Sequence, residues 1–185
     1  MQNVIQDSTL LLSNKFAKEL SYTLWGVFLL FLSAQISIPL EPVPITLQTF
    51  GVMLVALSFP RKTALQAVIT YLVLGGMGLP FFAGFTGGLA KFIGPTAGYL
   101  FGFLAAVAVM GALRQYFNRE NFFHIALNCL IGTLVIFAFG IGWLAYFMGI
   151  QKAVQVGLMP FILPGAVKIL LLAATIRYLK LGKRI

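Results

Sequence analysis

The sequence predicts an all-α integral membrane protein with six membrane-spanning helices, because it is strongly apolar, has few charges and has a length that suits six spans. Of its 185 residues, 60% are apolar and 9% are charged. Soluble globular domains have about 45–50% apolar and about 25% charged residues, so a water-soluble fold is excluded. Six spans of about 20 residues use roughly 120 residues and leave no room for a soluble second domain. We expect a cytoplasmic N-terminal segment over 1–20, a six-helix membrane domain over 21–181 and a basic cytoplasmic tail over 182–185.

Proline, glycine and charged residues mark the ends of the apolar segments. Residues 1–20 are too short, and in their second half too charged, for a cleaved signal peptide. The first span ends at PLEPVP because proline cannot continue a helix, and the short second span ends at Pro60. The third span ends in GGMGLP and leads into a glycine-rich stretch, 81–95. The six predicted spans are 21–38, 45–59, 63–79, 96–113, 122–147 and 160–181.

The basic residues support this number of spans and orient them. Thirteen Lys and Arg and four acidic residues give a formal charge of +9. In a soluble chain this charge would suggest a nucleic-acid partner, but basic residues beside apolar segments are typical of the cytoplasmic side of a membrane protein. We therefore expect no nucleic-acid binding, a multi-pass protein of the cell membrane, and both termini in the cytoplasm. Apart from Lys168, only Lys91 and Lys152 fall on the external side, whereas the cytoplasmic set is Lys15, Lys18, Arg61, Lys62, Arg114, Arg119, Arg177, Lys180, Lys183 and Arg184.

The titratable residues argue against an enzyme. Cys129 and His124 are the only cysteine and histidine, so the chain can form neither an intramolecular disulfide nor a Cys/His metal cluster. The segment GFTGGLAK lacks the glycine spacing and the Ser or Thr after Lys that a phosphate-binding loop needs. We expect no catalytic residue, no metal and no cofactor. The four acidic residues all lie in predicted loops or in the N-terminal segment: Asp7, Glu19, Glu41 and Glu120.

Lys168 is the most informative single position, because it lies inside the sixth predicted span. A charged side chain in the hydrocarbon region costs at least about 2.5–3.5 kcal/mol on insertion scales. At 1.5 Å per residue from Pro160, Lys168 lies about 12 Å along the helix, in the outer half of the membrane, where it can meet a solute from outside. The alternative is that Lys168 snorkels, so that its four-carbon side chain carries the ammonium group to the outer membrane interface.

Uncharged polar residues and a glycine-rich loop lie at the same outer level. Gln35 is close to the end of the first span, and Thr46, Gln48 and Thr49 open the second. Their amides and hydroxyls can bind a polar ligand or hydrogen-bond between helices. The loop that contains Lys91 is either a lid that offers its lysine to an anion or a flexible connection with interfacial aromatic residues.

Three segments identify a known family. They are IPLEPVPITLQTF, GLPFFAGFTGGLAKFIGPTAGYLFGF and MPFILPGAVK, in this order. Over roughly 35–173 the chain resembles the BioY biotin transporters, which are six-helix substrate-capture subunits (S components) of energy-coupling-factor (ECF) importers. The resemblance implies biotin as the ligand, bound in a cavity near the outer face. It also implies an ECF transmembrane coupling protein and ATP-binding subunits as partners, so that ATP is used only by those subunits.

The family's motifs map onto individual positions of this chain. The lysine of the last span matches Lys168, the VPITLQT stretch matches 43–49, and the glycine-rich loop matches 84–95. The family usually has an acidic residue three positions before the lysine, where this chain has Gly165, and an Ala-x-x-x-Ala pattern on the first span, which is absent here. The open alternative is therefore an S component for another vitamin-like or anionic solute. The candidate substrate-binding residues are Lys168, Lys91, Gln48, Thr46, Gln35 and Tyr99.

The predicted orientation can be tested by labelling. In a Cys129→Ala background, Lys91→Cys and Lys152→Cys should react with a membrane-impermeant maleimide on whole cells, because both positions are predicted to be external. Arg61→Cys and Arg119→Cys serve as controls on the predicted cytoplasmic side and should remain unlabelled until the cells are opened. Labelling of either control on intact cells would overturn the orientation.

Overall fold

The computed structural model describes the backbone of residues 2–118 and 120–179, and their side chains from residue 16 onward. Arg119, Lys180 and the predicted tail at 182–185 lie outside these ranges. The helices are α1 Gln2–Gln35, α2 Gln48–Ser58, α3 Arg61–Gly76, α4 Ala97–Leu113, α5 Phe122–Met148, α6 Ile150–Gly157 and α7 Ile162–Leu179. Two 3-10 helices, η1 Leu89–Phe92 and η2 Met159–Phe161, and two short strands, β1 Ser37–Ile38 and β2 Ile45–Thr46, complete the described elements.

The predicted all-α class is confirmed, and six helices coincide with the six predicted spans: α1, α2, α3, α4, α5 and α7. Two boundaries differ from the expectation. Helix α1 continues through residues 20 and 21 without a break, and the connection after α5 contains the additional short helix α6. The segments Phe122–Met148 and Ile150–Leu179 are long and apolar enough to cross a membrane, whereas α2 and α4 are shorter apolar helices.

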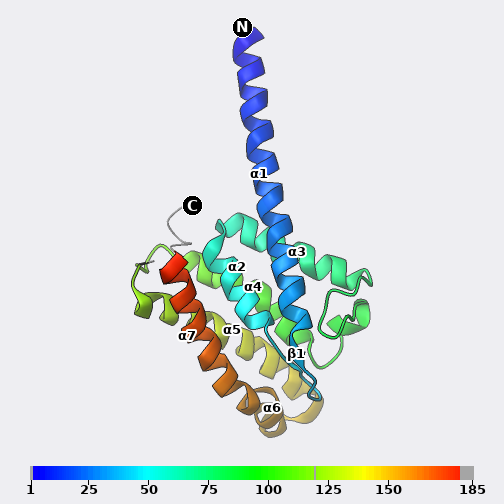
Figure 1. The fold of residues 1–185 in the computed structure, drawn as a ribbon. Coiled ribbons are helices and arrows are strands. Elements are labelled where there is room, and N and C mark those ends of the chain that lie inside the picture. Colours follow the sequence, from blue (N-terminus) through cyan, green and yellow to red (C-terminus); the bar gives the residue numbers. More distant parts are fainter. Residues whose placement is uncertain (1, 119, 180–185) are drawn as a thin grey trace.

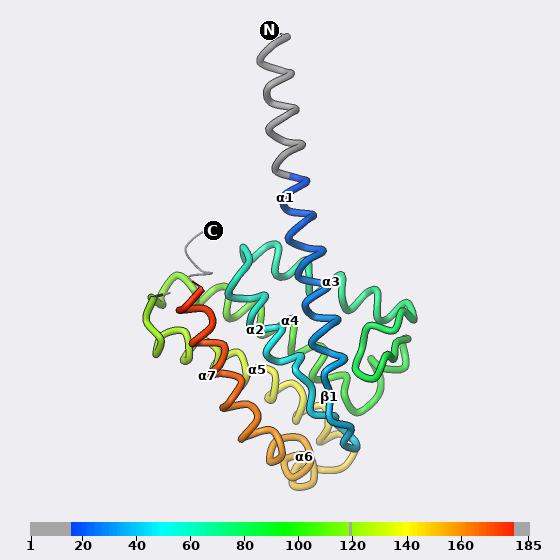
Figure 2. Tube along the Cα trace, viewed as in Figure 1, coloured from blue at the N-terminus to red at the C-terminus, as the bar shows by residue number. Residues whose placement is uncertain are grey.

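The two ends of the bundle differ in structure (Figure 1). The end of α7 and the part of α1 that begins at residue 16 point toward one end, as the tube also shows (Figure 2). The opposite end carries α6 and the hairpin of β1 and β2, which pair antiparallel with Ser37 opposite Thr46 and Ile38 opposite Ile45. We call this second end the hairpin end.

Glycines allow α4 and α5 to pack closely. A methyl group built on Gly98 of α4 would overlap the backbone oxygen of Phe139 and the Cβ of Trp143 on α5. One turn later, a methyl group on Gly102 would lie 3.0 Å from the Cα of Ile136. Absent side chains let two helix backbones approach, which is a usual basis of helix association in membranes.

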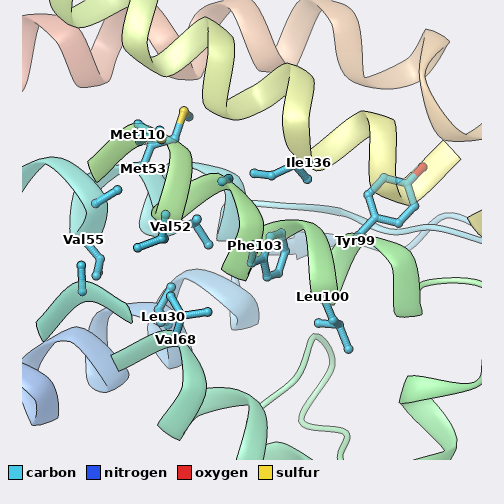
Figure 3. Packing of buried hydrophobic residues seen from close by; sticks show 14 of the residues in the cluster. Leu30, Val52, Met53, Val55, Val68, Tyr99, Leu100, Phe103, Met110 and Ile136 are labelled. Carbon is cyan, nitrogen blue, oxygen red and sulfur yellow. The ribbon is translucent and has the colours of Figure 1, made fainter. Parts of the chain in front are cut away.

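The core of the bundle is apolar and continuous across the helices. Leu30 of α1, Val52 and Met53 of α2, Val68 of α3 and Phe103 of α4 all belong to one buried cluster (Figure 3). The outer surface is apolar as well, as a bilayer requires, because lipid tails are as apolar as the core. Large apolar side chains exposed on the long helices include Leu24, Trp25, Phe28, Leu32, Phe101, Leu134, Phe139, Leu163, Leu170 and Leu171.

The close contact of α4 with α5 gives a stability prediction. Gly98→Ala should lower the free energy of unfolding by about 1–3 kcal/mol, the usual cost of overpacking, because the added methyl group meets backbone atoms. The matched control is Gly142→Ala on α5, where a methyl group would meet nothing within 4 Å. Unfolding in detergent, followed by circular dichroism, measures both. Equal stability of the two variants would contradict the packing described here.

Candidate functional site

A cavity of about 380 Å³ lies near the hairpin end of the bundle. Its volume falls in the range of about 300–1,000 Å³ that is typical of small-molecule sites. Residues from the hairpin, α2, α4, α5, α7 and the loop before α4 form its wall. The lining is mostly apolar and includes Val43, Phe82, Leu100, Phe103, Phe137 and Phe161.

The prolines between α1 and α2 create the polar part of the wall. Pro39, Pro42 and Pro44 interrupt the helix, and the chain turns back as the hairpin. The amide of Leu47 donates to the carbonyl oxygen of Ile36 at 2.9 Å and closes this turn. As a result Thr46, Gln48 and Thr49 face the cavity at the start of α2.

Lys168 of α7 is joined to this polar corner. Its ammonium donates to the backbone oxygen of Thr46 at 2.6 Å and to the hydroxyl of Thr49 at 3.1 Å, and the side chain lines the cavity. An ammonium has three N–H donors, so one remains for a ligand. Within the described part of the chain, both of its hydrogen-bond partners are neutral oxygens.

The wall beside Lys168 is open. Gly165, one helical turn earlier, also lines the cavity, and a methyl group built there would meet nothing within 4 Å. Across the described lining, Lys91 and Lys168 are the charged residues and no acidic residue is present. The cavity is therefore electrostatically suited to a ligand that is anionic or presents strong hydrogen-bond acceptors.

The glycine-rich stretch 81–95 covers one side of the cavity, and we call it the lid loop. Phe82 and Thr86 form a two-residue bridge within it, with the amide of Phe82 donating to the oxygen of Thr86 at 2.8 Å. Lys91 lies in η1, is partly exposed and lines the cavity. The indole of Trp143 on α5 donates to the backbone oxygen of Gly94 at 3.0 Å and fastens the far end of the loop.

The structure brings five of the six candidate residues together in the cavity wall. Lys168, Lys91, Gln48, Thr46 and Tyr99 line it, whereas Gln35 is outside the described lining. The Gln35 amide instead holds the lid loop, because its nitrogen donates to the backbone oxygens of Phe81 and Phe82, each at 3.3 Å, and its oxygen accepts from the amide of Phe85 at 2.9 Å.

Tyr99 presents its ring to the cavity, while its hydroxyl is already used. The hydroxyl donates to the backbone oxygen of Gly157 at the end of α6 at 2.9 Å. Gly140 and Gly157 allow this arrangement, since a methyl group on either would overlap or crowd the tyrosine side chain. Tyr99 can therefore contact a ligand through its ring and at the same time hold α6 against α4.

Some lining residues were not candidates from the sequence. Thr133, Phe137 and Phe161 contribute to the wall from α5 and η2. Thr133 lies in the middle of a long apolar span, and a lone hydroxyl there is usually bonded to its own helix, as it is here to the oxygen of Cys129 at 2.9 Å. The two phenylalanines are indistinguishable by sequence from the many others on lipid-facing positions.

Comparison with known proteins finds similarity to transporters in sequence and in fold. The family model described as BioY family matches residues 4–184. A biotin transporter BioY of Thermotoga maritima is 42% identical over 151 residues, covering 80% of this chain and 88% of that protein. A probable biotin transporter BioY of Rickettsia prowazekii is 33% identical over 172 residues, covering 93% of this chain and 88% of that protein.

A solved structure has the same fold. It is the S-component for biotin from an ECF-type ABC transporter, with a TM-score of 0.81 and 27% sequence identity, and the match covers 90% of this chain and 93% of that one. The expected resemblance to ECF S components is thereby confirmed for the all-helical membrane fold.

Proposed function

The chain belongs to the BioY family, and on this premise we propose that it takes up biotin across the cytoplasmic membrane as the substrate-binding S component of an ECF-type transporter. The observation that carries the proposal is the mostly apolar cavity, in whose described lining the two charged residues are both lysines. No bond is made or broken in this activity, and the chain works by binding and release.

The chemistry of biotin fits the two kinds of wall. Its thioether ring and aliphatic chain are apolar, its ureido ring carries one carbonyl acceptor, and its tail ends in a carboxylate. The phenylalanine-lined wall takes up the apolar parts. Lys168 donates its third N–H to the ureido oxygen, and Lys91 in the lid loop pairs with the carboxylate.

We assign the hairpin end to the outer face and both termini to the cytoplasm, as a multi-pass protein of the cell membrane. The location of the cavity supports this orientation, since an importer must meet its ligand outside. The charges support it too, because Lys91 and Lys152 belong to the lid loop and to α6 at the hairpin end.

We assign the energy source to partner subunits. The sequence contains no phosphate-binding loop, so ATP would be hydrolysed by ATP-binding subunits and transmitted through an ECF transmembrane coupling protein. No cofactor is required in this scheme, and the lipid bilayer is the remaining partner. Reorientation by the partners would empty the cavity toward the cytoplasm.

A second candidate is an S component for another anionic, vitamin-like solute. The open space at Gly165 and the absence of an acidic residue from the described lining favour it, because ligand N–H groups then find no carboxylate acceptor beside Lys168. Competition of a panel of anionic vitamins against labelled biotin separates the two candidates.

Lys168 provides the direct test of the binding site. Lys168→Met keeps much of the side-chain volume and removes the charge, so biotin affinity should fall by roughly ten- to 150-fold, the value of one lost charge-assisted hydrogen bond of about 1.5–3 kcal/mol. Lys152→Met, on the exposed part of α6, is the matched control and should bind as the parent does. Isothermal titration of purified protein measures both, and unchanged affinity of Lys168→Met would remove this residue from the site.

The coupling scheme predicts that binding and transport separate. Purified protein should retain biotin without ATP, because binding needs only this chain, whereas vesicles that contain only this chain should not concentrate biotin when an ion gradient is imposed. Retention and accumulation of radiolabelled biotin measure the two steps. Accumulation driven by the ion gradient alone would contradict a partner-driven importer.

A further inference from the structure

A continuous path of hydrogen bonds leads from Lys168 to the lid loop. Lys168 donates to the backbone oxygen of Thr46, and the hydroxyl of Thr46 donates to the amide oxygen of Gln48 at 3.1 Å. The amide nitrogen of Gln48 donates to the hydroxyl of Tyr71 on α3 at 2.7 Å. That hydroxyl donates to the backbone oxygen of Phe81, at the start of the lid loop, at 3.0 Å. The path therefore connects α7, the start of α2, α3 and the lid.

Tyr71 occupies the centre of this path without touching the cavity. It is 1% exposed and is absent from the described lining. Its ring packs against Phe81 and Phe82, with centroid distances of 6.1 and 5.6 Å. A phenolic hydroxyl has one hydrogen to donate, so the hydrogen used for Phe81 leaves the oxygen as the acceptor for Gln48. The hydroxyl group of Tyr71 thus holds both the side chain of Gln48 in the cavity wall and the backbone of Phe81 at the start of the lid loop.

The Tyr71 hydrogen bond is one of several that hold the lid loop. Gln35 holds the same oxygen of Phe81 from α1, but at 3.3 Å, and its hydrogen bonds do not reach Gln48. The amide of Gly88 donates to the backbone oxygen of Gly75 at 2.7 Å. The segment with η1 and Lys91 lies between Gly88, which is bonded to Gly75 of α3, and Gly94, whose backbone oxygen accepts from Trp143 of α5. The Tyr71 hydroxyl differs from these contacts because it also bonds Gln48 of the cavity wall.

We propose that Tyr71 is a positioning residue that links the polar wall of the cavity to the lid loop, so that a bound ligand and a closed lid stabilise one another. A ligand that accepts a hydrogen bond from Lys168 restrains Thr46 and Gln48, and Gln48 restrains Tyr71 and Phe81. The link is a property of this chain, and only the use of biotin as the probe rests on the proposed function.

Tyr71→Phe removes the hydroxyl and keeps the buried ring. We expect biotin to dissociate about tenfold faster, because two hydrogen bonds of modest net value are lost, while the association rate stays within about twofold. Tyr22→Phe is the matched control, since Tyr22 is half-buried and stacks on Phe59 at 5.7 Å, away from the cavity. Stopped-flow binding in detergent resolves the two rates. Unchanged dissociation, or loss of affinity through the association rate alone, would overturn the proposal.

A double-mutant cycle distinguishes the link from a purely structural role of Tyr71. Gln48→Met removes the other end of the 2.7 Å hydrogen bond. If the two residues act through one path, the effect of Tyr71→Phe on dissociation should shrink to about threefold or less in the Gln48→Met background. If the two substitutions instead changed the dissociation rate by independent factors, so that the double variant showed their product, Tyr71 would only support the fold.

Hydrogen exchange of the ligand-free protein provides a readout that does not depend on biotin. The amides of Phe82 and Thr86, which are hydrogen-bonded within the lid loop, should exchange about tenfold faster in Tyr71→Phe and unchanged in Tyr22→Phe. Among the described residues, the hydrogen bonds of Gln48 reach the lid loop through Tyr71, so Gln48→Met should accelerate the same amides to a smaller extent. Unaltered exchange of these amides in both Tyr71→Phe and Gln48→Met would refute the link. If the parent protein did not bind biotin, the proposed function would fail, and the exchange rates would still decide the role of Tyr71.

Discussion

The interior of a bilayer offers no hydrogen-bonding partner to a backbone amide or carbonyl group, and this constraint decides where the chain leaves helical geometry. Two such places lie at the hairpin end, at 36–47 and at 77–96. In the first, Ile36 accepts from Leu47 and the carbonyl of Thr46 accepts from Lys168. In the second, the loop pairs with itself, with Gly75 of α3 and with the side chains of Gln35, Tyr71 and Trp143. Both non-helical segments thus find several of their hydrogen-bonding partners within the protein.

The same constraint explains why a cavity forms at this end. Helix α2 has 11 residues, and at 1.5 Å per residue it covers about 16 Å, roughly half of the hydrocarbon thickness. The hairpin before α2 spans the rest of the hydrocarbon thickness. It cannot face lipid because its backbone is irregular. Irregular backbone is tolerated at depth where it lines a cavity within protein. The short helix and the cavity are therefore two aspects of one arrangement.

The sequence predicts the parts of this arrangement that depend on composition, but not those that depend on contacts between distant segments. Spans follow from hydrophobicity, and Lys168 follows from the cost of a charge in the bilayer. The role of Gln35 did not follow, because an amide at the end of a span has the same signal whether it binds a ligand or holds a loop. Tyr71 gave no signal, since its partners Gln48 and Phe81 are 23 and 10 residues away and meet it only after folding. The continuity of α1 and the short α6 were also missed, because neither changes the number of apolar segments.

The partners of Lys168 explain how a cation can lie in a mostly apolar cavity wall whose described residues include no acid. Two neutral oxygens, from Thr46 and Thr49, take the place of part of its hydration shell, so the charge is solvated rather than neutralised. A carboxylate at position 165 would compete with the ligand for the third N–H, whereas Gly165 leaves both that donor and the space beside it to the ligand. Neutral solvation of the lysine and a missing side chain one turn away are consequently complementary, because together they leave one N–H of Lys168 and the space beside it open to the cavity.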